Sequence, residues 1–147
     1  MKILTIIITL LLTLFTNAQL IYKGQSFAFV GPMLHFNIGN EKTKVSFGLE
    51  ASYWRVINVN SVLVGSDFGI DYEFGTKKIR IYTEAQAGSG IGLSLGPVLE
   101  IQNGKHYFGA QGSLWVALIG GIDLRWRKTD YNYFSPGLMF KLPLIKQ

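Results

Sequence analysis

Apolar and polar residues alternate one by one along most of the chain that follows the N-terminal segment. From Val62 to Phe74 the even positions are mainly aliphatic or aromatic, whereas the odd positions include Asp67, Asp71 and Glu73. Successive side chains of a β-strand point to opposite faces, so this period of two predicts strands. No apolar period of 3.6 residues occurs after the N-terminal segment. The sequence therefore predicts an all-β protein.

Turn-forming clusters divide the alternating pattern into segments. Gly75-Thr76-Lys77 and Asn103-Gly104-Lys105 are examples of clusters that favour tight turns. The predicted strands cover residues 26–38, 44–56, 61–74, 78–88, 91–102, 105–116, 119–128 and 132–144. Ala117 to Gly121 is an apolar turn, and the parity is the same on both sides of it. Six long strands are therefore an alternative to eight.

Charged residues follow the same alternation. Most of the nine acidic residues lie on the polar phase, and the apolar phase has no charge between strand ends. If the apolar phase faces lipid, an Arg or Lys there costs about 2–4 kcal/mol at the bilayer midplane, which explains the exclusion. An open sheet edge in hydrocarbon leaves backbone groups unpaired, so the sheet must close. The pattern predicts a transmembrane β-barrel.

The polar phase then faces the barrel interior, where opposite charges can pair. The predicted interior network consists of Glu50, Asp67, Asp71, Glu73, Arg80, Glu84, Glu100, Asp123, Arg125 and Lys141. Hydrophobic residues make up 48% of the chain, and the mean hydropathy is +0.26. Both values are high for a soluble protein of 147 residues and agree with a membrane location.

Several segments are similar to a known family. The stretches "FVGPMLHFNIG", "VSFGLEASYW" and "LSLGPVLEI" resemble the outer-membrane β-barrel domain of Gram-negative bacteria, and the whole pattern resembles the small barrels that include the OmpA membrane domain and OmpX. This resemblance implies an eight-stranded antiparallel up-and-down barrel in the outer membrane. It also implies that both chain termini are periplasmic.

The N-terminus has the features of an export signal. Lys2 is followed by a run of apolar residues and threonines from Ile3 to Phe15, and small residues precede Gln19. A membrane-spanning helix needs about 20 apolar residues, which this run does not reach. We expect a cleaved signal peptide at residues 1–18 and one barrel domain at residues 19–147.

Periplasmic termini would place the turns at residues 39–43, 75–77, 103–104 and 129–131 on the outer side. A basic outer rim is predicted there, comprising Lys42, Lys44, Lys77, Lys78, Lys105, Arg127 and Lys128. Such a rim suits outer-membrane lipid, in particular the phosphates of lipopolysaccharide. Alternatively, these residues simply solvate the turns. The basic residues are too dispersed for a nucleic-acid-binding arm, although the net charge is +5.

The candidate chemistry is sparse. Asp71 and Glu73 would lie about 6.5–7 Å apart on one strand face, where they could form an acid-base pair or ligate calcium. Structural pairing with Arg80 and Arg125 is the simpler interpretation. His35 and His106 show no evident arrangement with serine and an acid, and there is no cysteine or Gly-rich phosphate loop. The sequence assigns no catalytic residue, metal or cofactor, and the protein is predicted not to be an enzyme.

The predicted function is that of a non-enzymatic outer-membrane barrel with a structural role or a role in binding a partner or lipopolysaccharide. A channel for small solutes is one alternative. A secreted lipocalin-like calyx, with the apolar phase turned inward around an apolar ligand, is another. A lipid-modifying enzyme that uses histidine is a third.

Two further expectations concern prolines and aromatic residues. Pro32, Pro97 and Pro136 fall inside predicted strands, and the apolar parity reverses at Gly31-Pro32, so bulges or strand ends are expected at these prolines. Aromatic residues near strand ends are expected to form interfacial girdles. They are Tyr53, Trp54, Tyr72, Phe74, Tyr107, Phe108, Trp126, Tyr131, Tyr133 and Phe134.

Overall fold

The computed structural model describes residues 23–39, 42–57, 62–117 and 120–146. The expected signal peptide and the predicted turns near residue 59 and residue 118 lie outside these ranges. The described strands are β1 (Ser26–Asn37), β2 (Lys44–Val56), β3 (Leu63–Glu73), β4 (Lys78–Ser89), β5 (Ile91–Gln102), β6 (Lys105–Val116), β7 (Gly120–Lys128), β8 (Asn132–Phe140) and β9 (Leu142–Lys146). No helix in the described ranges is long and apolar enough to cross a membrane.

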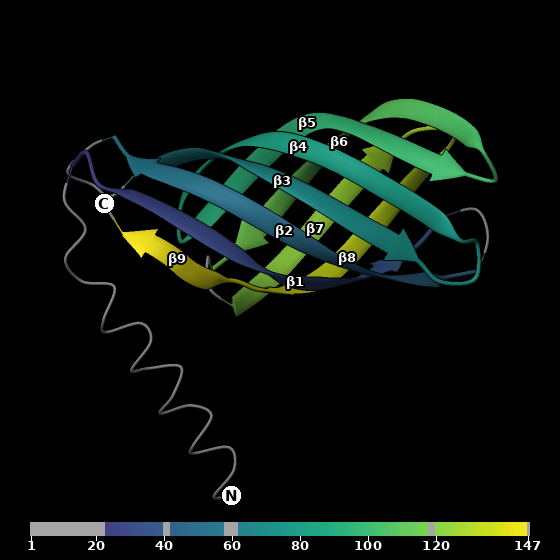
Figure 1. The fold of residues 1–147 in the computed structure, drawn as a ribbon, viewed down its shortest axis with the longest axis horizontal. Coiled ribbons are helices and arrows are strands. Elements are labelled where there is room, and N and C mark those ends of the chain that lie inside the picture. The colour runs from purple at the N-terminus through teal and green to yellow at the C-terminus, as the bar shows by residue number, and fades with distance from the viewer. Residues whose placement is uncertain (1–22, 40–41, 58–61, 118–119, 147) are drawn as a thin grey trace, which may run out of the picture.

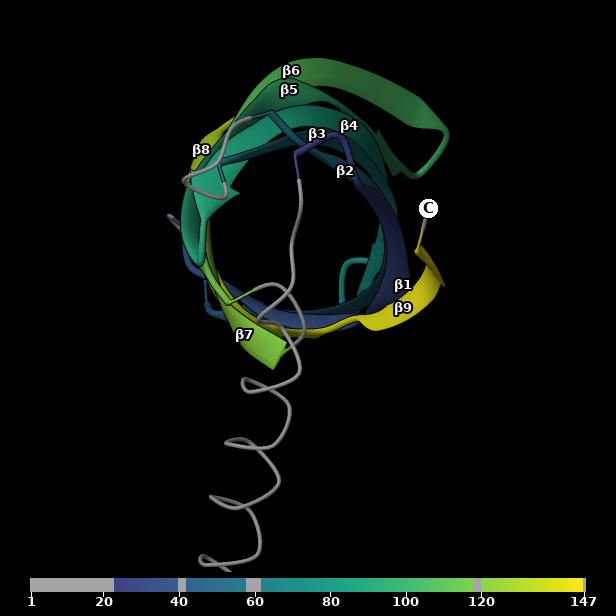
Figure 2. The same cartoon turned by 90° about the vertical axis from the view of Figure 1, so that its left-hand side faces the viewer.

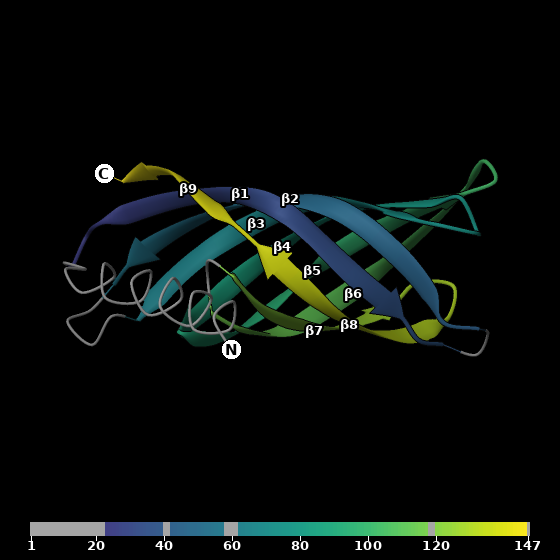
Figure 3. The ribbon, with the colours of Figure 1, turned by 90° about the horizontal axis from the view of Figure 1, so that it is seen from below.

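The strands form one closed antiparallel wall. Each strand from β1 to β7 pairs with the next, and β1 pairs with β8 and β9 to close the ring (Figure 1). β9 continues the line of β8 beyond Lys141, so β8 and β9 together act as the eighth strand of the barrel (Figure 3). β6 and β7 are separate strands that pair at Val116 and Ile122. The prediction of eight strands is confirmed, and the six-strand alternative is wrong.

Four pairs of consecutive strands meet at the same end of the barrel. β1 ends and β2 begins at the end opposite the last residues of β9, where the turns β3–β4, β5–β6 and β7–β8 also lie (Figure 1). Asn103 and Gly104 connect β5 and β6 with backbone φ angles of 51° and 76°. Positive φ at both central residues is required by a type I′ turn, whose twist matches that of the flanking strands.

The alternation of side chains along each strand separates a buried interior from an exposed outer wall. Along β2 and β4 every second side chain is buried inside the ring and its neighbours are exposed on the outer wall. Figure 2, a view along the barrel, shows the wall as a ring around these inward positions. The inward residues are largely polar and the outward ones largely apolar, as the alternation predicted. This orientation excludes the lipocalin-like calyx, which requires the reverse.

The expectation of bulges at three prolines is wrong. The register of β1 with β2 is continuous through Pro32, that of β5 with β6 through Pro97, and that of β7 with β8 through Pro136. Each proline instead faces a short gap in the ladder on its other side, where its missing N–H costs no hydrogen bond. The register shift of β1 with β9 lies between Ala28 and Phe29, opposite Pro143.

Glycines allow neighbouring strands to approach closely at these gaps. A Cβ atom on Gly31 would lie 1.7 Å from the carbonyl oxygen of Phe140, and one on Gly96 would lie 1.8 Å from that of Thr83. Only glycine fits such a distance. The Gly-Pro pairs at residues 31–32 and 96–97 therefore mark places where the backbones of two neighbouring strands approach closely.

The interior contains an apolar plug that extends from the end where β2 finishes and β3 begins to the middle of β4 and β5. Its residues are Phe29, Met33, Trp54, Val56, Leu63, Tyr82, Val98, Trp115 and Met139. Odd positions of β1 face inward from Phe29 to Asn37, so the side-chain parity does not reverse at Gly31-Pro32. The apolar pattern reversed because the interior itself changes from apolar to polar along β1.

Candidate functional site

All ten residues predicted for the polar interior are buried in the lumen. The most exposed of them, Asp67 and Lys141, are each 4% accessible. They come from five strands (β2, β3, β4, β5 and β7) and the break between β8 and β9, and each is a buried, inward residue. They divide into a cluster around Arg80, a cluster around Arg125, and two acidic residues with no cationic partner.

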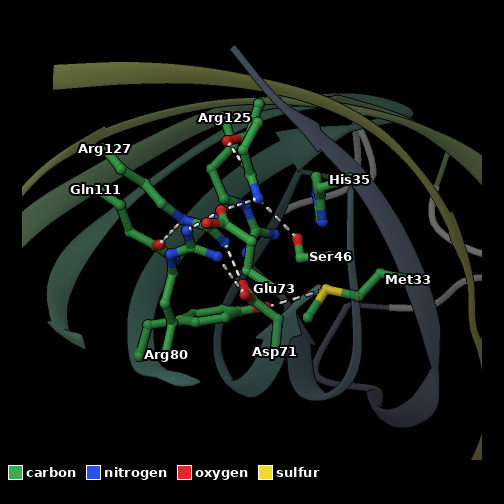
Figure 4. A network of polar contacts seen from close by, with 12 residues as sticks. Met33, His35, Ser46, Asp71, Glu73, Arg80, Gln111, Arg125 and Arg127 are labelled. Atoms are coloured by element: carbon green, nitrogen blue, oxygen red, sulfur yellow. Dashed lines mark hydrogen bonds and ion pairs between the residues drawn. The ribbon is translucent and has the colours of Figure 1, made fainter. Parts of the chain in front are cut away.

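Arg80 on β4 is the centre of the first cluster. Its guanidinium is 2.8 Å from Asp71, contacts Glu73, and lies 3.1 Å from Glu100. Tyr133 donates a hydrogen bond of 2.6 Å to Glu100. One arginine thus bridges three carboxylates, as Figure 4 shows for Asp71 and Glu73. The pairing leaves Asp71 and Glu73 engaged with cations, and it supports their structural interpretation.

Two residues assigned to the basic rim lie inside the barrel instead. Lys78 is fully buried and its Nζ is 2.8 Å from Glu100. Arg127 is also buried, with a nitrogen 2.7 Å from Asp71 and its Nε 2.8 Å from Gln111. Both have the inward parity of their strands, β4 and β7. Their parity in the sequence could have predicted this position. The rim prediction considered only that both residues are close to a turn.

The second cluster, around Arg125, includes Glu50 on β2. Its carboxylate contacts Lys141 and lies 3.0 Å from Arg125, and Tyr82 donates a hydrogen bond of 2.6 Å to it. Arg125 also pairs with Asp123 on its own strand. Every charge in this cluster therefore has an opposite charge in contact, which buried ions require.

Sequence reasoning missed several lumen residues. His35 is completely buried, and its Nε2 lies 3.0 Å from Asp123. Its Nδ1 has no hydrogen-bond partner within the described part of the chain, so no serine is aligned with it. His106 is exposed at the start of β6, and the two histidines are not brought together. The geometry therefore offers no support for a histidine-based lipid-modifying site.

Asp67 and Glu84 differ from the other interior acids. They are direct cross-strand partners on β3 and β4. No ion pair involves either of them among the described residues, and neither oxygen of Glu84 has a hydrogen-bond partner there. Carboxylate oxygens of Glu50, Asp67 and Glu84 lie within 4.8 Å of one another. This is the only group in the described ranges with an arrangement suited to a metal ion.

The remaining residues predicted for the rim lie at the end with the β3–β4, β5–β6 and β7–β8 turns. Lys42, Lys77, Lys105 and Lys128 are exposed, and Lys44 is half-buried. Asp130 is the one exposed acid among the described residues, because the other seven acids in those ranges are buried in the lumen. Negative charge in the described residues therefore lies mostly inside the barrel, and the exposed charges are predominantly positive.

The aromatic girdle is only partly formed. Tyr53, Tyr72 and Trp126 point outward and are 51%, 38% and 52% exposed. Trp54 and Tyr133, which were assigned to the girdle, are inside: Trp54 belongs to the plug and Tyr133 to the Arg80 cluster. Both have inward parity on strands whose ends carry aromatic residues on both faces.

The outer wall carries a continuous apolar surface. Leu93 and Leu95 are 64% and 69% exposed, and comparable residues occupy the outward positions of every strand from β1 to β9. Arg55, Lys105 and Lys128, the charged side chains exposed on described strands, each lie within two residues of a strand end. A closed wall that is apolar outside and ionic inside has lipid as its outer solvent. The chain is a transmembrane β-barrel.

Comparisons with known proteins find likeness only in overall shape. No protein-family model and no curated protein matches the sequence. A designed transmembrane β-barrel is similar with a TM-score of 0.49 and 8% identity over 83% of this chain and 98% of the other. The attachment invasion locus protein Ail of Yersinia pestis is similar with a TM-score of 0.38 and 14% identity over 82% of this chain and 100% of the other. The transmembrane barrel assignment follows from the register and side-chain orientation of this chain itself.

Proposed function

We propose that this protein is a non-enzymatic outer-membrane barrel with a closed lumen, and that its basic rim binds the phosphates of outer-leaflet lipopolysaccharide. The observation that carries the proposal is the sorting of charge. Seven acids are buried among the lumen residues, whereas four of the five exposed lysines among the described residues (Lys42, Lys77, Lys105 and Lys128) lie at one end of the wall. Each basic residue near an anionic membrane surface contributes about 1 kcal/mol of attraction.

A groove on the outer wall supports a lipid as the partner. It has a volume of about 600 Å³ and is lined by residues that include Ile38, Leu95, Trp126 and Phe134. Lys128 also lines it, at the end nearest the rim. An acyl chain in the apolar part would bring a phosphate group toward this lysine. The groove therefore suits an amphiphile with an anionic head.

The filled lumen argues against the channel alternative. Arg80, Arg125 and their carboxylate partners cross the interior, and the plug around Trp54 and Trp115 occupies one end. Two cavities among lumen residues have volumes of only about 10 and 20 Å³, roughly the space that one water molecule requires. We expect no steady conductance when the purified barrel is inserted into planar bilayers. Stable single-channel steps would contradict the closed lumen.

The rim proposal is tested by neutralising lysines at one end at a time. The triple variant Lys42→Gln, Lys77→Gln and Lys128→Gln should bind lipopolysaccharide more weakly by about 1 kcal/mol for each lysine, because each loses one phosphate contact. The matched control is Lys23→Gln with Arg55→Gln, which removes exposed charge at the opposite end. Binding is measured in nanodiscs with intact and with dephosphorylated lipopolysaccharide.

Three results would support the rim as the binding surface: weaker binding by the triple variant, unchanged binding by the control, and little difference between the two with dephosphorylated lipid. Added salt should weaken wild-type binding as well, because exposed charges are screened. Equal binding by wild type and the triple variant would overturn the proposal. So would an equal loss in the control pair.

A further inference from the structure

The lumen has more negative than positive charge. Among its fully buried described residues there are seven carboxylates (Glu50, Asp67, Asp71, Glu73, Glu84, Glu100 and Asp123) and five cations (Lys78, Arg80, Arg125, Arg127 and Lys141). The excess is two negative charges. Five of the seven acids make ion pairs, so the uncompensated pair consists of Asp67 and Glu84.

These two acids are neighbours that should repel each other. Asp67 on β3 and Glu84 on β4 are paired directly across the strands, a position in which like charges destabilise a sheet. The two carboxylate oxygens of Asp67 accept hydrogen bonds from the Gln86 side chain and from the Glu84 backbone N–H. Those donors are neutral and do not compensate the charge. Such an arrangement calls for a further positive partner.

Glu84 is the second and independent sign that a partner is missing. Its side chain is 2% exposed, and both of its carboxylate oxygens lack a hydrogen-bond partner in the described structure. A buried carboxylate without any donor is costly. Its free oxygens lie in the same group as those of Asp67 and Glu50, within 4.8 Å of one another.

We propose that Asp67, Glu84 and Glu50 bind one divalent cation of the calcium type inside the barrel. Calcium prefers carboxylate oxygens at about 2.3–2.6 Å, so its opposite ligands are up to about 5 Å apart, which agrees with the grouping of these atoms. One such ion neutralises the two surplus charges. Glu50 reaches the site from β2 while it keeps Lys141 and Arg125 as partners.

The space beside these carboxylates has room for a single small ion. Glu50, Asp67 and Gln86 line a cavity of about 10 Å³ between the Arg125 cluster and the plug. Trp54 and Trp115 line the same cavity. The ion would therefore join the polar interior to the apolar plug and hold β2, β3 and β4 together. This role is independent of what the rim binds.

Calcium binding is tested with the full barrel folded in a nonionic detergent and stripped with EDTA. Equilibrium dialysis with radioactive calcium should give one ion per wild-type chain, and calcium should raise the unfolding temperature. Glu84→Gln should abolish both effects and still fold, because it removes an uncompensated buried charge. Asp67→Asn is the second variant. The matched control is Glu100→Gln, a lumen acid that already pairs with Lys78 and Arg80 and should leave one bound calcium.

Terbium gives an optical readout of the same position. Excitation of tryptophan should sensitise emission from a terbium ion beside Trp54 and Trp115, and calcium should displace the signal. The signal should be absent in Glu84→Gln and retained in Glu100→Gln. Three results would overturn the proposal: no calcium or terbium bound by the wild type, equal binding by Glu84→Gln, or wild-type stability that responds to pH and not to calcium. The last would show that Asp67 and Glu84 share protons instead.

Discussion

Trp54 and Trp115 meet edge to face inside the barrel, with ring centroids 5.2 Å apart and ring planes at 74°. One comes from the end of β2 and the other from the end of β6, on opposite sides of the ring. Gly92 makes the contact possible, because a Cβ atom there would lie 2.0 Å from the Trp115 ring. The pair closes one end of the lumen with apolar side chains, and the ionic clusters fill the rest.

Replacing Trp54 with alanine should destabilise the barrel by about 3–5 kcal/mol, because it leaves a large cavity in the plug. The change is measured by urea unfolding in detergent micelles. Trp126→Ala is the control, since that ring is 52% exposed on the outer wall and has lipid rather than protein around much of it. Equal losses in the two variants would show that the plug contributes no special packing.

Removing the Arg80 side-chain charge should be more damaging than removing a surface charge. Arg80→Met leaves Asp71, Glu73 and Glu100 without their shared cation, and breaking a buried ion pair costs about 3–5 kcal/mol. Arg55→Met, at an exposed position, should change the free energy of unfolding little. Arg80→Lys should recover only part of the loss, because lysine cannot reproduce the fork of the guanidinium. Full recovery would argue against the bridging geometry.

A methyl group at Gly31 should push β1 away from β8 and destabilise the barrel. Gly31→Ala places a Cβ atom 1.7 Å from the Phe140 carbonyl oxygen, and overpacking of this kind costs about 1–3 kcal/mol. Gly120→Ala is the matched control, because the nearest atom to its Cβ would be 3.5 Å away. Heat-modifiable gel mobility and unfolding midpoints should both be lowered in the first variant only. If the two alanines behave alike, the backbones of β1 and β8 do not approach so closely.

Arginine substitutions at two depths in the membrane test whether lipid covers the outer wall. Leu95→Arg puts a charge on the wall in the middle of β5 and should cost about 2–4 kcal/mol, whereas Phe108→Arg should cost about 0–1 kcal/mol near the interface. Phe108 is 80% exposed on the part of β6 that extends beyond its pairing with β7. Folding into lipid vesicles measures both. A Leu95→Arg variant as stable as the wild type would mean that water, not lipid, covers this wall.

Much of the barrel could be predicted from local pattern. The strand boundaries agree with the prediction to within a few residues, and residue parity alone places Asp67, Glu84 and Arg125 in the interior. Turn proximity was a poorer guide than parity. It assigned Lys78 and Arg127 to the rim, although both continue the inward rows of their strands.

The sequence by itself determined which row of side chains faces lipid, because a strand repeats every two residues and a charge is costly on the lipid face. Only the tertiary structure decided which interior residues meet. The register between strands sets the height of each side chain along the barrel, so it brings Arg80 to Tyr133 and Arg125 to Glu50 across long stretches of sequence. Trp54 shares the inward parity of Glu50, but only the tertiary structure shows that it packs in a plug, because apolarity alone does not distinguish a dry interior from a lipid-facing wall.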